Sequence, residues 1–131
     1  MSDCIFCKII NKEIPGKIVY EDDECMAFLD LSQATYGHTL VIPKKHYANI
    51  LEVDDETLAH VMKIVKNLAN QIVEKLDAKG VNVLTNEVAG QTVHHFHIHI
   101  LPRYDENELK IEFTDHSNDV DLDEVYKKIT K

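Results

Sequence analysis

Hydrophobic residues recur at helical spacing in the middle of the chain. Between residues 54 and 80 they fall every three or four positions, which is the period of one face of an α-helix. Asp54 suits the start of this helix, because acidic residues favour its positive amino end, and Gly80 suits its end. We therefore predict one long amphipathic helix. Its apolar stripe is formed by Leu58, Val61, Met62, Val65, Leu68, Ala69, Ile72 and Leu76.

Five shorter segments are rich in β-branched and aromatic residues and are bounded by turn residues. These predicted strands are residues 17–21, 24–30, 38–43, 81–85 and 92–101. Pro102 is expected to end the last strand. Short connections between neighbouring strands favour antiparallel pairing. We therefore expect an α+β fold with a five-stranded antiparallel sheet.

Two short helices are expected at the ends of the chain. Residues 4–11 place apolar side chains at helical spacing, and a last helix from about Asp121 would use Leu122, Val125 and Ile129. Between them we expect one domain over residues 1–104. Residues 105–131 form an acidic tail that packs on this domain or extends it.

Composition and charge exclude some classes of binding partner. The 131 residues include 44% hydrophobic and 28% charged residues, as in an ordinary globular domain. The net charge of −9 argues against binding to nucleic acid or to an anionic membrane. Three cysteines and no secretory signal favour a reducing, cytoplasmic setting. Acidic residues are nevertheless absent from residues 31–51 and 88–104, so a small anionic ligand could bind there.

Four of the eight histidines fall within residues 94–99. Alternate residues of a strand share a face, so His95, His97 and His99 would point one way and His94 the other. Three interpretations follow: exposed surface histidines, a metal site, or acid–base and nucleophilic catalysis. Three ligands from one strand fit a zinc tetrahedron poorly, whereas two of them with a distant ligand would fit better.

The run His95-Phe96-His97-Ile98-His99-Ile100-Leu101 resembles the signature of the histidine triad (HIT) superfamily. Several other segments resemble its Hint branch, in the zinc-containing bacterial form. They are residues 4–10, 14–15, 28–30, 37–46 and 90–93. The resemblance covers roughly residues 3–104 and implies a HIT-like fold, a nucleotide-binding hydrolase or transferase, and a homodimer.

The resemblance implies a reaction at the α-phosphate of a purine nucleotide. His97 would attack phosphorus and form a nucleotidyl-histidine, and water would then release a nucleoside monophosphate. Gln91 and His99 would handle the leaving group and its proton, and His38 would orient the histidines. Phosphoramidates, acyl-nucleotides and dinucleoside polyphosphates are the substrate classes implied. No organic cofactor or catalytic metal is needed.

The same resemblance implies a set of nucleotide contacts. Asp30 would hold the ribose hydroxyls. Asn86, Gln91, Thr92, Val93, His97 and His99 would surround the phosphate. The base pocket would be lined by Ile5, Phe6, Ile9, Phe28, Leu29, Leu31 and Leu40. Structural alternatives stay open: core packing for Ile9 and Leu40, turn capping for Asp30, and loop stabilisation for Asn86 and Gln91.

The Cys4-x-x-Cys7 motif has three interpretations: a redox pair, half of a zinc site, or two small core residues. In zinc-containing relatives a cysteine pair and two histidines hold a structural zinc. The matching positions are Cys4, Cys7, His46 and His95, a closed set that would leave the catalysis to His97 and His99.

Two other functions are compatible with these residues. One is a zinc-stabilised nucleotide-sensing or interaction module in which turnover is incidental. The other is a zinc hydrolase that uses the three histidines as catalytic ligands. Three departures from the Hint pattern make substrate choice the least secure inference: His94 replaces an aromatic residue, Thr92 replaces a serine, and tryptophan is absent.

Overall fold

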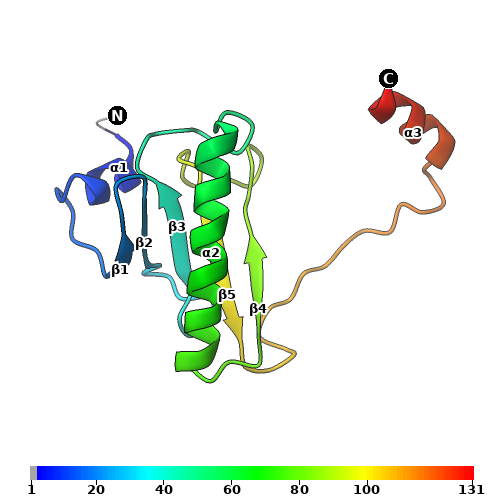
Figure 1. Ribbon diagram of the computed structural model, residues 1–131. Helices are drawn as coiled ribbons and strands as arrows, with labels where there is room; N and C mark the ends of the chain where they lie inside the picture. Colours follow the sequence, from blue (N-terminus) through cyan, green and yellow to red (C-terminus); the bar gives the residue numbers. More distant parts are fainter. Residues whose placement is uncertain (1–2) are drawn as a thin grey trace.

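The computed structural model describes residues 3–131. Its elements follow the predicted order of helix, three strands, long helix, two strands and final helix (Figure 1). They are α1 (Ile5–Ile10), β1 (Ile18–Glu21), β2 (Cys25–Leu29), β3 (Thr39–Pro43), α2 (Asp55–Lys75), β4 (Gly80–Leu84), β5 (Ile98–Arg103) and α3 (Leu122–Thr130). The predicted α+β class is confirmed.

The five strands form one open sheet in the order β1-β2-β3-β5-β4, and every neighbouring pair is antiparallel. A short turn joins β1 to β2, and a loop over residues 30–38 joins β2 to β3. Helix α2 carries the chain from β3 past β5 to β4, so β5 enters the sheet last, between them. Strands β1 and β4 are the two edges of the sheet.

Each face of the sheet is covered differently. Helix α2 lies along one face (Figure 1), where its buried residues Val61, Val65 and Leu68 pack with Val41 and Ile100. On the other face, Phe6 of α1 packs against a second apolar cluster. That cluster also contains Met26, Phe28, Leu40 and Ile42. The second face is only partly covered, because α1 is six residues long.

The last sheet strand differs from the prediction. It begins at Ile98 rather than near residue 92, and it continues through Pro102 to Arg103. Pairing with β3 ends at Ile100, so Pro102 has a strand neighbour only in β4, and a proline is tolerated there. Before β5 begins, the Phe96 N–H donates to the carbonyl of Tyr47 at 2.7 Å, and this bond is not part of the pairing between strands. Residues 92–97 are therefore irregular.

The acidic tail extends away from the domain. Figure 1 shows it leaving the sheet beside β4 and running to α3, which is separated from every other element. Helix α3 begins directly after Asp121, near its predicted start, and the Asp121 side chain caps it, but α3 has no buried residue. No helix among residues 3–131 is long and apolar enough to cross a membrane.

Candidate functional site: a pocket of histidines beside a thiol–imidazole cluster

The predicted alternation of residues 95–100 holds although half of this segment is not a strand. His95 and His97 both contact the Phe6 ring, with ring centroids 6.0 and 5.0 Å apart, on the α1 face of the sheet. Phe96, Ile98 and Ile100 belong to the core under α2. The three triad histidines therefore share one face.

His97 is held in a single tautomer. Its Nδ1 lies 2.7 Å from the backbone carbonyl of His95, and a carbonyl can only accept a hydrogen bond. Nδ1 therefore carries the proton and Nε2 carries the lone pair. The Thr85 hydroxyl donates to the carbonyl of His97 at 2.8 Å and fixes the backbone at this point. The residue is 4% exposed, so its ring has little freedom to turn.

His99 has the opposite tautomer because of His38. The Ala34 N–H donates to Nδ1 of His38 at 3.2 Å, which leaves the His38 proton on Nε2. That Nε2 lies 2.9 Å from Nδ1 of His99 and donates to it. The His99 proton is therefore on Nε2, an atom that is buried and has no partner among the described residues. His99 presents a free N–H donor beside the lone pair of His97.

Burial keeps these rings neutral. It lowers the pKa of His99 to about 4, helped by the neighbouring imidazoles of His97 and His38. Burial also lowers the pKa of His38, against the opposing effect of Asp30, whose Oδ2 lies 3.5 Å from His38 Nε2. A neutral imidazole has one nitrogen with a lone pair, which can attack or accept a proton, and one N–H, which can donate a hydrogen bond.

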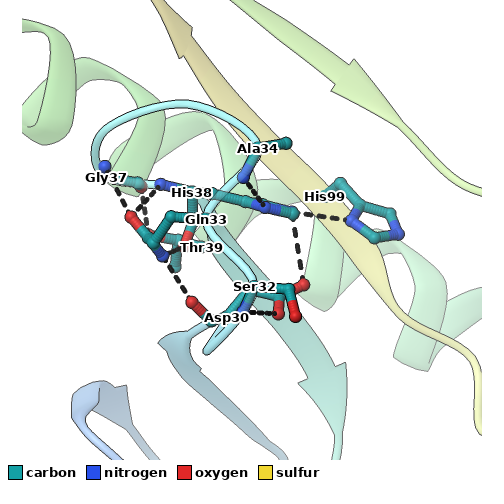
Figure 2. Close-up of polar contacts among 8 residues, drawn as sticks. All are labelled: Asp30, Ser32, Gln33, Ala34, Gly37, His38, Thr39 and His99. Atoms are coloured by element: carbon teal, nitrogen blue, oxygen red, sulfur yellow. Dashed lines mark hydrogen bonds and ion pairs between the residues drawn. The ribbon is translucent and has the colours of Figure 1, made fainter.

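Gln33 holds the loop that carries Asp30 and His38, a role that the sequence did not indicate. Its Oε1 accepts from the N–H groups of Gly37 and His38 at 2.8 and 3.2 Å. Its Nε2 donates to the carbonyls of Asp30 and His38 at 2.5 and 2.8 Å. Figure 2 shows these bonds closing the loop around the Gln33 amide. One side chain thus sets the distance between the carboxylate and the imidazole.

Gly37 is required at the turn before His38. Its φ is +94°, a region that L side chains rarely adopt, and an added Cβ would lie 2.5 Å from the Leu76 side chain. Any other residue would therefore strain the turn and would require the end of the Leu76 side chain to move aside.

A pocket of about 350 Å³ opens in front of His97 and His99. This volume is within the range of small-molecule sites. All seven residues predicted for the base pocket line it, together with Asp30, Thr92 and Val93. The sequence did not indicate four further lining residues, Ile14, Pro15, Gly16 and Ser32. The Pro15-Gly16 turn thus forms part of the wall of this pocket.

Asp30 caps a turn and also lines the pocket. Its Oδ1 accepts from the Ser32 N–H at 2.9 Å, which is the turn-capping role. Its Oδ2 faces His38, and the residue lines the pocket. One carboxylate oxygen is thus committed to the loop, and the other lies between the pocket and the histidines.

Two predicted phosphate contacts are not in the pocket. Gln91 is 7% exposed, its Nε2 donates to the Ala48 carbonyl at 2.5 Å, and its Oε1 accepts from the Val88 N–H at 3.1 Å. The prediction that Gln91 handles the leaving group is therefore not met in this conformation, since both ends of its amide stabilise the loop. Asn86 is exposed and is not among the lining residues.

The second cluster joins two thiols and two imidazoles; we call Cys4, Cys7, His46 and His95 the thiol–imidazole cluster. The Nδ1 of His95 lies 3.4 Å from Sγ of Cys4, 3.5 Å from Sγ of Cys7 and 3.1 Å from Nδ1 of His46. His46 Nδ1 lies 3.4 Å from Sγ of Cys7. The resemblance had implied this set, and the fold brings it together from three distant segments.

The donor set fits a zinc ion. Zinc bonds of about 2.3 Å to sulfur and 2.0 to 2.1 Å to nitrogen place tetrahedral ligand atoms roughly 3.3 to 3.8 Å apart. The His95 Nε2–H donates to the Pro43 carbonyl at 2.8 Å, which turns the Nδ1 lone pair toward the thiols. Four ligands would leave no open position, so the ion would be structural.

The protonation of the cluster also suits a cation. Burial raises the pKa of the Cys7 thiol to about 11 and lowers the pKa of His95 to about 4. The protein alone thus keeps this thiol protonated and this imidazole neutral, and a metal ion would displace the thiol proton. The three triad imidazoles do not converge on one point, because His95 turns to the thiols and His97 bonds to a carbonyl. This geometry disfavours a catalytic three-histidine zinc centre.

Comparison with known proteins establishes the family. The model of the HIT domain matches residues 11–106. The chain belongs to the HIT family. An uncharacterized HIT-like protein of Methanocaldococcus jannaschii is 49% identical over 128 residues, which cover 96% of this chain and 98% of the relative. The crystal structure of a HIT family protein from Bacillus anthracis has a TM-score of 0.90 at 42% identity, covering 98% of this chain and 93% of that one.

Three further HIT relatives have names that state a ligand or an activity. A Zn-bound histidine triad family protein from Mycobacterium smegmatis has a TM-score of 0.79 at 33% identity, covering 89% of this chain and 87% of that one. A HIT family hydrolase from Clostridium thermocellum has a TM-score of 0.73 at 38% identity, covering 86% and 99%. The adenylylsulfatase HINT3 of Arabidopsis thaliana is 41% identical over 104 residues, which cover 78% of this chain and 53% of the relative. Hydrolases thus occur among the relatives of this HIT protein.

Proposed function

We propose that this HIT protein is a nucleotide hydrolase or transferase that forms a nucleotidyl-histidine at His97. The observation that carries the proposal is the pair of opposite tautomers in one pocket. His97 presents a lone pair on Nε2, and His99 presents an N–H on Nε2. This arrangement suits attack at a phosphorus atom with a hydrogen-bond donor for the phosphoryl oxygens.

In the first step the Nε2 lone pair of His97 attacks the α-phosphorus. The new N–P bond replaces the bond from phosphorus to the leaving group, which departs with a proton taken from solvent water, while the Nε2–H of His99 donates a hydrogen bond to the phosphoryl oxygens. The imidazole becomes positively charged, and its Nδ1–H keeps the hydrogen bond to the His95 carbonyl. That bond strengthens as the charge forms, which stabilises the intermediate.

In the second step a water molecule attacks the same phosphorus. The proton of this water passes to the solvent, and the Nε2–H of His99 keeps its hydrogen bond to the phosphate. The N–P bond breaks, its electron pair returns to His97, and a nucleoside monophosphate leaves. Both residues end in their starting protonation states, as a catalytic cycle requires.

The walls of the pocket support a nucleotide as the substrate. Phe6, Phe28 and Leu40 offer an apolar surface on which a base can stack. Asp30 lies at the pocket with a carboxylate oxygen that can accept from ribose hydroxyls. Acidic residues are absent from residues 88–104, which lowers the cost of binding a phosphate there. These features fit purine nucleoside phosphoramidates, acyl-nucleotides or dinucleoside polyphosphates.

We also propose that the thiol–imidazole cluster holds a structural zinc in a reducing, cytoplasmic setting. Zinc bound there would tie α1 to the segment that precedes His97. It would thereby hold the base wall and the nucleophile at a constant separation.

The experiment is a rapid quench with adenosine phosphoramidate, lysyl-adenylate and diadenosine tetraphosphate. We expect the intact mass to increase by one nucleotidyl group, and peptide mapping should place the adduct on His97. His94→Ala, a histidine three residues away, is the matched control and should retain the adduct.

Two results would contradict the proposal. Undiminished turnover by His97→Ala would exclude His97 as the nucleophile. Tight binding of a nucleoside monophosphate with no cleavage of any of the three substrates would favour the nucleotide-sensing module instead.

A further inference from the structure

A second group of possible metal ligands lies on the α2 face of the sheet, away from the histidine pocket. It contains Asp22 and Glu24 of the β1–β2 turn, Cys25 at the start of β2, and His60 of α2; we call these four residues the Asp22–His60 cluster. A carboxylate oxygen of Asp22, the Cys25 sulfur and a ring nitrogen of His60 lie within 4.8 Å of one another. The fold thus joins three kinds of metal ligand from two distant segments.

The distances in this cluster are close to those that a zinc ion needs. Oδ2 of Asp22 lies 3.7 Å from Sγ of Cys25, and Nε2 of His60 lies 3.7 Å from Oε2 of Glu24. Both distances fall within the roughly 3.3 to 3.8 Å expected between tetrahedral zinc ligands. Asp22 Oδ2 and His60 Nε2 are closer, at 2.7 Å, because a hydrogen bond joins them. Replacing that proton by a metal ion requires them to separate by only about half an ångström.

Hydrogen bonds hold the Asp22 carboxylate in place for such a role. Its Oδ1 accepts from the N–H groups of Glu24 and Cys25, both at 2.8 Å, which fixes it in the turn. Its Oδ2 faces three donors, the Tyr20 hydroxyl and the His60 ring at 2.7 Å and the Cys25 thiol at 3.7 Å. A carboxylate oxygen has two lone pairs, so three donors exceed what it can bind well. One cation could replace the protons of the thiol and the ring, and Tyr20 would continue to orient the ligand.

The turn also carries negative charge that its surroundings do not neutralise. Residues 21–24 are four acidic residues in succession. Lys12 and Lys44 both pair with Glu21, at 2.9 and 2.8 Å. In the part of the chain that the structure describes, His60 is the only basic side chain that pairs with any of the other three. A divalent cation is therefore attracted to this turn.

The protonation states indicate that a metal ion would bind weakly and exchange with solvent. Burial, helped by the charge of Asp22, raises the pKa of the Cys25 thiol to about 12. Burial would also raise the pKa of Asp22, but hydrogen bonds from Tyr20 and from the turn lower it well below its usual range. Asp22 is therefore a carboxylate at neutral pH, whereas Cys25 is a protonated thiol. A bound ion must displace the thiol proton to solvent, and the His60 proton must move from Nε2 to Nδ1.

We propose that the Asp22–His60 cluster is a second zinc site, weaker than the thiol–imidazole cluster and in exchange with solvent. Thiolate, imidazole and carboxylate ligands together suit zinc, whereas magnesium and calcium prefer oxygen ligands alone. The Glu24 side chain is 64% exposed and the His60 side chain is 28% exposed, so an ion can reach the site. Zinc bound there would tie the β1–β2 turn to α2.

The first test counts zinc ions in the full-length protein. Loosely bound metal is removed, the remaining zinc is measured, and zinc is then added in a titration calorimeter. We expect one further zinc ion per chain, with a dissociation constant in the micromolar range. His60→Asn should raise that dissociation constant at least about tenfold. His116→Asn is the matched control, because His116 also lies beside an aspartate, 3.6 Å from Asp119, and this variant should bind zinc as the wild type does.

The second test asks whether the Cys25 sulfur is a ligand, with cobalt(II) as the probe. A bond between sulfur and cobalt gives a charge-transfer absorption in the near ultraviolet. Cys25→Ala should bind one cobalt ion fewer per chain than the wild type and lose the corresponding absorption, whatever metal the thiol–imidazole cluster holds. His60→Asn, at a partly exposed position outside the core, should lose the same absorption, so the result does not depend on a core substitution.

Three results would overturn the proposal. One is a wild-type protein that binds no further zinc at millimolar metal. Another is equal weakening by His60→Asn and His116→Asn, which would indicate unspecific binding to surface histidines. The third is a second ion that binds without the absorption due to Cys25, which would leave a site of carboxylates alone. None of these measurements involves turnover or the His97 adduct, so they are distinct from a failure of the proposed nucleotide chemistry.

Discussion

The thiol–imidazole cluster and the histidine pocket use neighbouring positions of one segment, yet one is closed and the other is open. His95 turns its free Nδ1 toward two thiols and a second imidazole, all within 4.8 Å. His97, two residues later, turns its free Nε2 into a pocket of about 350 Å³. The same side chain thus takes a structural or a chemical role according to what the rest of the fold places opposite it.

A backbone carbonyl decides each role. His95 donates from Nε2 to Pro43, which frees Nδ1, whereas His97 donates from Nδ1 to His95, which frees Nε2. Imidazole has two nitrogen atoms, and fixing one proton determines which of them is free to react or to bind a metal. The contrast between the two sites is therefore set by two hydrogen bonds, and it can be tested by changing one histidine at a time.

The largest expected effect separates the two histidines directly. His97→Ala should lower turnover by about a thousandfold or more, because no other group can form the nucleotidyl intermediate. Zinc content, measured by mass spectrometry of the metal, should stay unchanged. By contrast, His95→Ala should lose zinc and retain turnover. Equal loss of metal in both variants would show that the two sites are not separate.

The next effect tests whether the cluster is structural. Cys7→Ser should lower the free energy of unfolding by about 3 kcal/mol, because a bound zinc stabilises the fold. The measurement is chemical unfolding with and without a chelator. Cys25→Ala, which lies outside the cluster, should keep its sensitivity to the chelator. A wild-type protein whose stability ignores the chelator would contradict a structural zinc.

A smaller effect is expected when the hydrogen bond from His38 to His99 is removed. His38→Ala should lower kcat by about ten- to a hundredfold with little change in KM, because His99 loses the donor that keeps its proton on Nε2. His38→Gln, whose amide N–H can still donate, should retain more activity. Equal kcat values for the His38→Ala and His38→Gln variants would show that His38 does not orient His99.

Stability should also depend on pH through His99. The pKa of His99 is about 4 in the folded protein and about 6.5 when unfolded, so the unfolded state binds more protons between these values. Stability is therefore complete above pH 6.5 and falls as the pH drops toward 4, by about 1 kcal/mol at pH 5 after allowance for partial exposure. His99→Asn should flatten this dependence, whereas His116→Asn, at an exposed position, should not.

The smallest effect is expected at His94. This side chain is exposed and has no hydrogen bond among the described residues. His94→Ala should change stability by less than about 0.5 kcal/mol and leave both zinc content and turnover unchanged. A clear loss of either would give this residue a role that its position does not indicate.

Much of the fold could be predicted from local patterns. The apolar stripe of α2 and the apolar runs of β2 and β3 are buried as expected. The predicted bounds of β2 and β3 fell close to the observed ones, whereas α2 ends at Lys75 and the expected stop, Gly80, begins β4. The fifth strand could not be placed in this way. Its first half carries strand-forming residues, but the Phe96 N–H bonds to Tyr47 and the His97 imidazole bonds to the backbone, so no ladder forms until Ile98.

The residues of the candidate site also fell into two groups, those that the sequence identified and those that it misplaced or missed. The apolar positions of the pocket were identified because the resemblance carries them as a pattern. Gln91 was expected to face the phosphate, but its amide turns inward, because the buried Ala48 carbonyl and Val88 N–H need partners. Gln33 was missed because an amide that bridges a loop leaves no periodic signal in the sequence.

The sequence by itself determined the α+β class and the shared face of His95, His97 and His99, since periodicity is a local property, and its resemblance to the HIT family indicated the four residues of the thiol–imidazole cluster. Only the tertiary structure decided which nitrogen of His95 and of His99 is free, because that depends on the Pro43 carbonyl and the His38 imidazole, which lie in distant segments. It alone also left α3 with no buried residue, since exposure is a property of the whole fold.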